Sequence, residues 1–154
     1  MTLLDAKEYD PRRERRRRLQ ISTSIFVVLV IAFFAWNFRY WPEERIVDKF
    51  FDALQQKQYE TAYGIWFHDP DWQQHKDKYG NYPFDRFQED WSPTSSQNEY
   101  GVIKSHDIVA ARMAGNVLLM GIRLNGAKSK ALFLNYDPKS HQLGFSPVEL
   151  YLGP

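Results

Sequence analysis

The sequence predicts an α+β domain that follows an N-terminal transmembrane helix. Residues 21–36 contain no ionisable side chain and form one continuous apolar segment. Residues 42–93 then repeat apolar side chains at the spacing of helices, whereas residues 99–152 alternate between apolar and polar side chains with the period of strands. These three patterns indicate helices packed on a curved antiparallel sheet of about four strands, behind a membrane anchor.

The apolar segment is long enough to cross a bilayer once. Ten of the residues from 21 to 36 are Ile, Val, Leu or Phe. With Leu19 and Gln20 included, a helix here reaches about 27 Å, slightly less than an average hydrocarbon core of about 30 Å. We therefore expect a basic cytoplasmic arm over residues 1–18, a transmembrane helix with an aromatic outer flank over residues 19–41, and one extracytoplasmic domain over residues 42–154.

The flanks of this segment predict its orientation. Six arginines precede it with one acidic residue, Glu14, among them, and the acidic pair Glu43 and Glu44 follows it. By the positive-inside rule the N-terminus lies in the cytoplasm and the domain outside the plasma (inner) membrane. The arginines also contact anionic membrane lipid, and aromatic side chains suit the outer headgroup layer. The residues that set this topology are Arg12, Arg13, Arg15, Arg16, Arg17, Arg18, Trp36 and Trp41.

Three alternatives compete with an uncleaved anchor. A cleaved signal peptide needs small residues before the cut, and Phe33 and Phe34 stand where an A-x-A site needs them. A twin-arginine export signal at Arg17 and Arg18 lacks the residues that would surround it. The arginine run could instead bind nucleic acid, but in this position its ordinary role is to hold the topology and contact anionic lipid. The domain itself is not a polyanion binder by bulk charge, because residues 42–154 carry twelve Lys and Arg against fifteen Asp and Glu. We therefore expect lipid contact and no nucleic-acid partner.

Four helices are expected in the first half of the domain. Pro42 suits a first helical turn, and Asp69 followed by Pro70 is typical of a helix N-cap. Apolar side chains recur three and four positions apart between these points, and Ser92-Pro93 ends the last helix. The expected helices cover residues 42–56, 58–67, 69–78 and 84–91.

The second half of the domain, residues 99–152, is expected to fold as consecutive hairpins. Asn125-Gly126 is the strongest local signal, because both residues readily take the positive φ angles of a two-residue type I′ turn. This turn sets Leu124 opposite Ala127 and, further along, Leu118 opposite Phe133 on the face that meets the helices. The expected strands cover residues 100–113, 117–124, 128–136 and 142–152, the last interrupted by Pro147.

The predicted register gives the other face of the sheet an apolar strip with three cations beside it at the hairpin tip. A strip of this kind needs cover, which a helix, a second copy of the domain or another membrane protein would supply. We therefore expect this face to be an interaction surface. Its residues are Val117, Leu119, Leu132, Leu134, Arg123, Lys128 and Lys130.

Residues 50–54 read FFDAL and residues 59–63 read YETAY, and this pair of segments resembles the nuclear transport factor 2-like (cystatin-like) α+β superfamily. The resemblance covers nearly all of residues 42–154. It implies a cone-shaped domain with a pocket between helices and sheet, used for ligand binding, for isomerase or dehydratase chemistry, or for assembly. The layout of basic arm, span and such a domain also resembles the inner-membrane assembly subunit of type IV secretion systems. Aromatic side chains that either fill the core or line the pocket are Phe50, Tyr63, Trp66, Phe87 and Trp91.

Few residues in the sequence suggest chemistry. His68, Asp71 and His75 fall close to helical spacing, but helix capping explains this segment without a metal. His106 and Asp107 are adjacent strand residues, so they point to opposite faces and form no acid–base pair. The chain also has no cysteine. We therefore expect no catalytic residues, no metal and no cofactor.

The expected function is that of a single-pass, membrane-anchored, non-catalytic interaction or assembly module. The first alternative is a domain that binds a small apolar ligand or lipid in its aromatic cavity. The second is an isomerase-like enzyme that draws on the ionisable groups of the domain. Those groups are Tyr63, Asp85, Asp90, His106 and Asp107.

Overall fold

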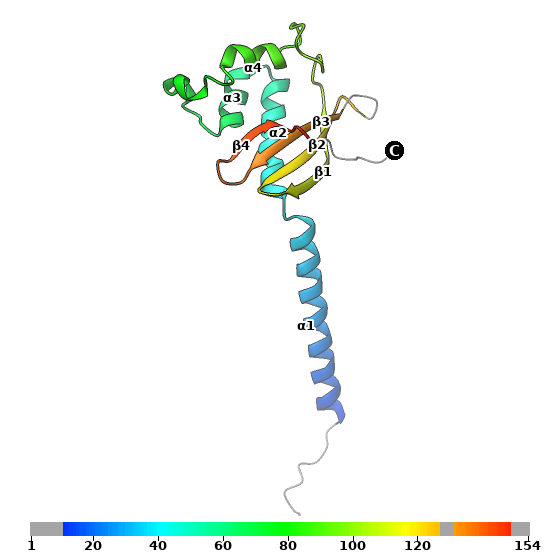
Figure 1. Ribbon diagram of the computed structural model, residues 1–154. Helices are drawn as coiled ribbons and strands as arrows, with labels where there is room; N and C mark the ends of the chain where they lie inside the picture. Colours follow the sequence, from blue (N-terminus) through cyan, green and yellow to red (C-terminus); the bar gives the residue numbers. More distant parts are fainter. Residues whose placement is uncertain (1–10, 127–130, 149–154) are drawn as a thin grey trace, which may run out of the picture. The chain divides into compact units, whose positions relative to one another are not determined.

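The computed structural model describes residues 11–126 and 131–148. The chain divides into two compact units, residues 1–39 and residues 40–154. Within the described residues the first unit is one long helix, and the second contains helices followed by an antiparallel sheet (Figure 1). The α+β fold class expected from the sequence is confirmed.

The first unit is the helix α1, Pro11–Asn37. It buries none of its side chains, and large apolar residues such as Phe26 and Val28 are exposed at 66 % and 64 %. Within the described residues, one helix is long enough and apolar enough to cross a membrane, and that helix contains this apolar segment. Membrane anchors and signal sequences share this property. The arginine run lies within α1 and is itself helical.

Two helices open the domain where the sequence predicts them. They are α2, Trp41–Gln55, and α3, Tyr59–Phe67. Pro42 lies in the first turn of α2, and α3 ends where His68 takes a left-handed φ of 53°. The apolar stripe of α2 faces the core as expected. Its buried residues are Val47, Phe50, Phe51, Ala53 and Leu54.

The prediction of a third helix over residues 69–78 is wrong. The segment forms two short 3₁₀ turns because it is organised around the carboxylate of Asp69. This carboxylate accepts hydrogen bonds from the Asp71 backbone N–H at 3.0 Å and the Tyr79 hydroxyl at 2.6 Å, and it pairs with the His75 ring at 2.9 Å. Side-chain acceptors of this kind compete with helical backbone bonding. The two turns are Trp72–Gln74 and Lys76–Tyr79.

The last expected helix is confirmed as α4, Phe84–Trp91. The first strand, however, begins at His106 rather than near Tyr100. Asn98 causes the delay, because its side-chain oxygen accepts the backbone N–H groups of Tyr100 at 2.8 Å and Gly101 at 3.0 Å. Backbone donors that bond locally are not available to a sheet.

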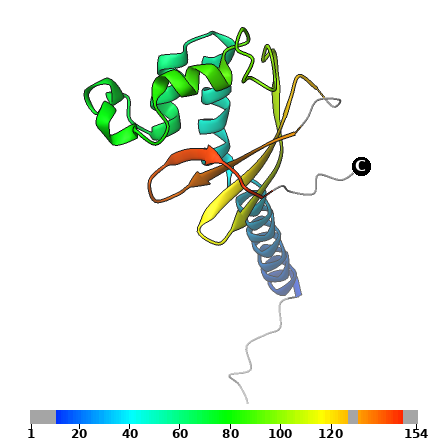
Figure 2. The same ribbon diagram turned by 45° about the horizontal axis from the view of Figure 1, so that its top comes forward.

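In the described residues four strands form one antiparallel sheet in the order β1-β2-β3-β4. Helices α2, α3 and α4 pack on one face of this sheet (Figure 2). The strand β1 carries a bulge between Ile108 and Ala110. The last strand is shorter than predicted, and its expected end over residues 149–152 lies outside the described residues. The strands are β1 His106–Ala114, β2 Val117–Leu124, β3 Ala131–Asp137 and β4 Gln142–Phe145.

The register of β2 against β3 differs from the prediction by three positions. Leu118 pairs with Tyr136 instead of Phe133, and Arg123 pairs with Ala131. This register does not fit a two-residue turn at Asn125-Gly126.

The contacts of Asn125 explain the change of register. Asn125 and Gly126 do have positive φ angles of 55° and 93°, as a type I′ turn requires. Asn125 nevertheless bonds backwards to the segment before β1, donating its backbone N–H to the Ser105 carbonyl at 3.0 Å. Its side chain also accepts the Lys104 N–H at 2.7 Å and donates to the Val102 carbonyl at 2.8 Å. These bonds hold Asn125 against the segment that precedes β1.

A shift by an odd number of positions exchanges the two faces of β3. Leu132 and Leu134, expected on the outer interaction face, instead face the helices and are 3 % and 0 % exposed. Phe133, expected in the core, pairs with Gly121 on the outer face. The core between helices and sheet is thus made by both halves of the domain. Its largest fully buried side chains are Tyr63, Phe50, Phe51, Phe87, Leu118, Met120, Ile122, Leu124, Leu134 and Val47.

Candidate functional site

The five aromatic residues predicted either to fill the core or to line a pocket form one packed cluster. The ring of Phe50 lies at its centre, with centroid distances of 5.3 Å to Trp66 and 5.2 Å to Trp91. Phe87 is 6.2 Å from Phe50 and 5.2 Å from Tyr63. All five side chains are buried. Rings therefore occupy the space between helices and sheet where the family resemblance implies a pocket.

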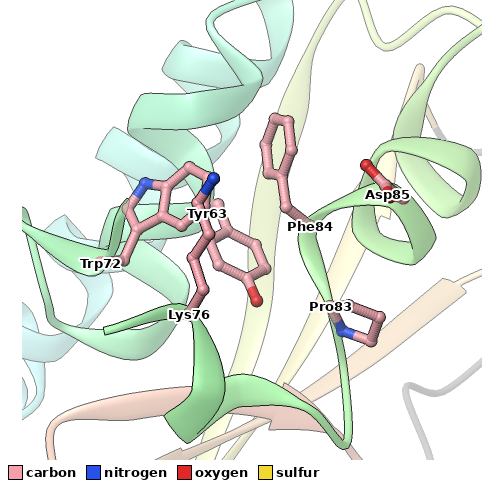
Figure 3. Close-up of a pocket in the computed structure, with 6 residues that line it drawn as sticks. All are labelled: Tyr63, Trp72, Lys76, Pro83, Phe84 and Asp85. Carbon is pink, nitrogen blue, oxygen red and sulfur yellow. The ribbon is translucent and has the colours of Figure 1, made fainter. Parts of the chain in front are cut away.

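A small cavity lies beside this cluster, next to Tyr63. Its volume is about 190 Å³, and Trp72 and Phe84 stack nearby at 4.9 Å (Figure 3). The Tyr63 hydroxyl donates to the Tyr82 carbonyl at 2.7 Å, and burial raises its pKa. Figure 3 shows Asp85 on the far side of Phe84 from the Tyr63 ring. The lining residues are Tyr63, Trp72, Lys76, Pro83, Phe84 and Asp85.

One wall of this cavity is held by Asp69. The hydrogen bond from Tyr79 holds the pKa of Asp69 below its usual range. Burial, together with the same bond, raises the pKa of Tyr79 to about 12. The pair therefore stays as a carboxylate that accepts and a phenol that donates over the whole neutral range. Trp72 is fixed on the same segment by donating its ring N–H to the Glu60 carbonyl at 3.1 Å.

Replacing Asp69 by Asn should destabilise the domain in a pH-dependent way. A carboxyl whose pKa is lowered on folding contributes stability above its unfolded pKa, and the contribution is lost as the pH falls through the folded pKa. We expect Asp69→Asn to lower the urea midpoint near pH 7 and to have a much smaller effect near pH 3. The exposed neighbour change Asp71→Asn is the matched control. Equal losses at both pH values would contradict a role for the carboxylate charge.

A larger groove, about 430 Å³, lies between α2 and α3. Ile46 and Ile65 are half-buried apolar residues in its wall, whereas Lys49 on α2 and Glu60 on α3 are exposed. Gly64 keeps the groove hollow and close to the next segment, because a Cβ there would lie 3.2 Å from the Asp69 carbonyl. The residues that line it are Ile46, Lys49, Glu60, Thr61, Gly64, Ile65, His68 and Pro70.

The sequence analysis missed this groove. The available signal was Ile65, which lies off the inner stripe of Ala62, Tyr63 and Trp66 and so adds an apolar residue to the outer side of α3. A single apolar residue on a helix surface is common, and only the placement of α2 beside α3 makes it part of a groove.

The predicted interaction face of the sheet is only partly retained. Val117, Leu119 and Arg123 alternate with the core residues of β2 and lie on the face away from the helices. Leu119 is 6 % exposed, and Phe133 joins this face after the change of register. Leu132 and Leu134 belong to the core, and Lys128 and Lys130 lie outside the described residues.

The ring of His106 does not pair with its sequence neighbour Asp107. Its ring pairs with the Asp48 carboxylate at 3.1 Å and the Gln55 side chain at 3.0 Å, and stacks on Phe51 at 5.0 Å. These contacts join β1 to α2. Asp107 points to the opposite, exposed face.

The remaining acidic residues considered for acid–base chemistry either bond to other side chains or lie at separate places in the domain. Asp90 accepts the Tyr82 hydroxyl at 2.9 Å and pairs with Arg86 at 3.3 Å. Burial, with the Asp90 hydrogen bond as the next cause, raises the pKa of Tyr82. Asp85 lies at the cavity beside Tyr63. The acidic residues considered in the sequence are therefore spread over three places in the domain.

The histidines of the expected 68–75 segment are separated by the fold. His75 pairs with Asp69, whereas the ring of His68 lies 5.1 Å from the ring of His141 in the turn before β4. The Asp71 backbone N–H donates a hydrogen bond to the Asp69 carboxylate. Among the residues that the structure describes, no three His, Cys, Asp or Glu side chains gather as a metal cluster.

The residues predicted to set topology lie on α1 and at the start of α2. The six arginines occupy the first two turns of α1, where Arg18 pairs with Glu14. Trp36 is 71 % exposed, with the Arg39 guanidinium 4.2 Å from its ring centre. Trp41 is 51 % exposed at the first residue of α2.

The fold and these sites define a class of protein: an α+β domain of helices on an open antiparallel sheet, preceded by a long apolar helix. Comparison of the chain with protein-family models, with curated proteins and with solved structures finds no match.

Proposed function

We propose that this protein is a single-pass, membrane-anchored interaction module without catalytic activity. Its N-terminus lies in the cytoplasm, α1 spans the plasma (inner) membrane, and its nuclear transport factor 2-like domain lies on the outer side. The six arginines before the apolar segment support this orientation. The exposed apolar surface of α1, which buries no side chain, supports a span in lipid.

The groove between α2 and α3 is the observation that carries the proposal. Ligand sites usually measure about 300–1,000 Å³. The groove, at about 430 Å³, falls within this range, and the cavity beside Tyr63, at about 190 Å³, falls below it. The groove therefore offers the better binding surface of the two.

The walls of the groove indicate the chemistry of its partner. Ile46 and Ile65 provide apolar contact, Lys49 lies on the α2 side, and Glu60 lies on the α3 side. An amphipathic helix of a partner protein fits this arrangement when its apolar face meets the isoleucines. Charge complementarity then places an acidic side chain beside Lys49 and a basic one beside Glu60.

Ile65→Glu in the full-length, membrane-bound protein tests the groove. It should reduce the yield of crosslinked partner at least about tenfold, because a charge would replace an apolar contact. Val109→Glu is the matched control, since Val109 is an exposed valine on β1 and does not line the groove. Both variants should still unfold in one cooperative thermal transition, although Ile65→Glu should lower the midpoint because Ile65 also packs against the core. An undiminished yield for Ile65→Glu would reject the groove as the interaction site.

The second candidate function is binding of a small apolar ligand, favoured by the aromatic walls of the cavity beside Tyr63. Its volume of about 190 Å³ limits the ligand to roughly a single ring, since an apolar cavity of about 150 Å³ holds benzene. Native mass spectrometry of the same preparations separates the two functions. A co-purified small molecule, retained in Ile65→Glu, would favour the ligand-binding domain.

A further inference from the structure

We infer that His68 and His141 form a binding site for a divalent transition-metal ion. His68 follows the last turn of α3, and His141 closes the turn between β3 and β4. Their ring centroids are 5.1 Å apart, although the two residues are distant in the sequence. Both side chains are exposed, so an ion reaches them directly from solvent.

The ring separation matches two imidazoles on one metal. Metal–nitrogen bonds to histidine measure about 2.0–2.1 Å, so a ring centre lies about 3.2 Å from a bound ion. At a tetrahedral angle, two such ring centres are about 5.2 Å apart, and at a right angle about 4.5 Å. The observed 5.1 Å lies within this interval, at its tetrahedral end.

The backbone holds both imidazoles in place. His68 and His141 have left-handed φ angles of 53° and 58°, a conformation that glycine and asparagine adopt more readily than other residues. The His141 N–H donates to the Asp137 carbonyl at 2.7 Å, which closes its turn. Gln142 donates its side-chain N–H to the Phe67 carbonyl at 3.3 Å. Because Phe67 and Gln142 are the neighbours of the two histidines, this bond joins the two sides of the site.

Tyr136 positions the ring of His141. Its hydroxyl oxygen lies 2.6 Å from His141 Nδ1, so Nδ1–H donates to the hydroxyl when Nε2 binds a metal. Tyr136 is 2 % exposed, so its ring is fixed in the core and its hydroxyl is held at this position. Metal-binding histidines commonly have a second hydrogen bond of this kind.

The site supplies two nitrogen ligands, and water completes the coordination. Imidazole favours Cu²⁺, Ni²⁺ and Zn²⁺ over Mg²⁺ or Ca²⁺, and Cu²⁺ binds most tightly in the usual order of divalent ions. We therefore expect one ion per chain, with Cu²⁺ bound more tightly than Zn²⁺ and no competition by Mg²⁺. The bound ion would clamp the β3–β4 turn to the end of α3, beside the groove that His68 helps to line.

Asparagine variants of the full-length protein in detergent, purified with a tag free of histidine, test the site. Asparagine removes the imidazole but tolerates the left-handed backbone. In Cu²⁺ and Zn²⁺ titrations, His68→Asn and His141→Asn should each lower the affinity by about tenfold or more. His75→Asn, which removes an exposed histidine paired with Asp69, is the control and should leave the affinity unchanged.

Electron paramagnetic resonance of the wild-type protein with one equivalent of Cu²⁺ provides a second measurement. Two coordinated imidazole nitrogens are expected, falling to one in either asparagine variant. Tyr136→Phe should weaken binding while preserving both nitrogens, because Tyr136 acts through His141. Unchanged affinity in both His68→Asn and His141→Asn, or a copper signal lost only with His75→Asn, would overturn the proposal.

Discussion

Leu134→Asp is expected to unfold the domain, whereas Phe133→Asp leaves it folded. Leu134 is fully buried opposite Met120, so an aspartate there places a carboxylate among apolar side chains without a partner. The cost should be about 4 kcal/mol or more, which approaches the whole stability of a typical domain, about 5–15 kcal/mol. Phe133 is half-buried on the other face of β3, and its replacement should cost less than about 2 kcal/mol.

Urea unfolding followed by tryptophan fluorescence measures this difference in the full-length protein. The two residues are adjacent in β3, so both substitutions place an aspartate in the same strand. The type I′ register suggested by the sequence would give the reverse result, with Phe133 in the core. A folded Leu134→Asp protein beside an unfolded Phe133→Asp protein would therefore reject the observed register.

The error in register shows which sequence signal was misjudged. Asn125-Gly126 predicted positive φ angles correctly, but the side chain of Asn125 bonds to the backbone of Val102 and Lys104, which no local pattern reveals. The alternation within β3 was the better guide. Leu132, Leu134 and Tyr136 make one face wholly apolar, whereas the other includes Asn135. A pattern over a whole strand therefore outweighs a two-residue turn signal.

The helices were predictable where local signals agreed. Pro42 at the start of α2 and the boundary before Pro93 both lie as expected. The helix predicted after Asp69 does not form, because the Asp69 carboxylate bonds to the side chains of His75 and Tyr79 instead of capping a helix. A helix cap and bonds to distant side chains use the same carboxylate oxygens. Which of the two forms depends on where later residues of the chain lie in the fold.

The candidate site was less predictable than the fold. Apolar periodicity identified Phe50, Trp66 and Trp91 as inward-facing, but it carries no information on whether rings fill a space or surround it. The groove depends on how α2 lies beside α3. The histidine pair joins the end of α3 to a turn in the sheet half of the domain, a proximity that arises from the sheet topology.

Changing the six arginines at 12, 13 and 15–18 to glutamine is expected to disturb the membrane orientation of most molecules. In the wild type, seven Lys and Arg precede the apolar segment, and Arg39, Arg45 and Lys49 follow it closely. The glutamine variant retains Lys7 alone on the upstream side, so the charge bias reverses. Each cation near an anionic surface contributes about 1 kcal/mol, so the combined effect should exceed any single substitution on the domain surface.

Protease added to spheroplasts measures this orientation. The wild-type domain should be degraded from outside while the N-terminal arm stays protected, and the glutamine variant should leave a large protected fraction of the domain. Changing the same six arginines to lysine is the matched control, because it keeps the charge and should preserve the wild-type pattern. If lysine and glutamine variants behave alike, charge does not orient the helix. If the wild-type chain is recovered without residues 11–37, then α1 is a cleaved signal sequence. That result would reject both the membrane anchor and the topology that the arginines are proposed to set.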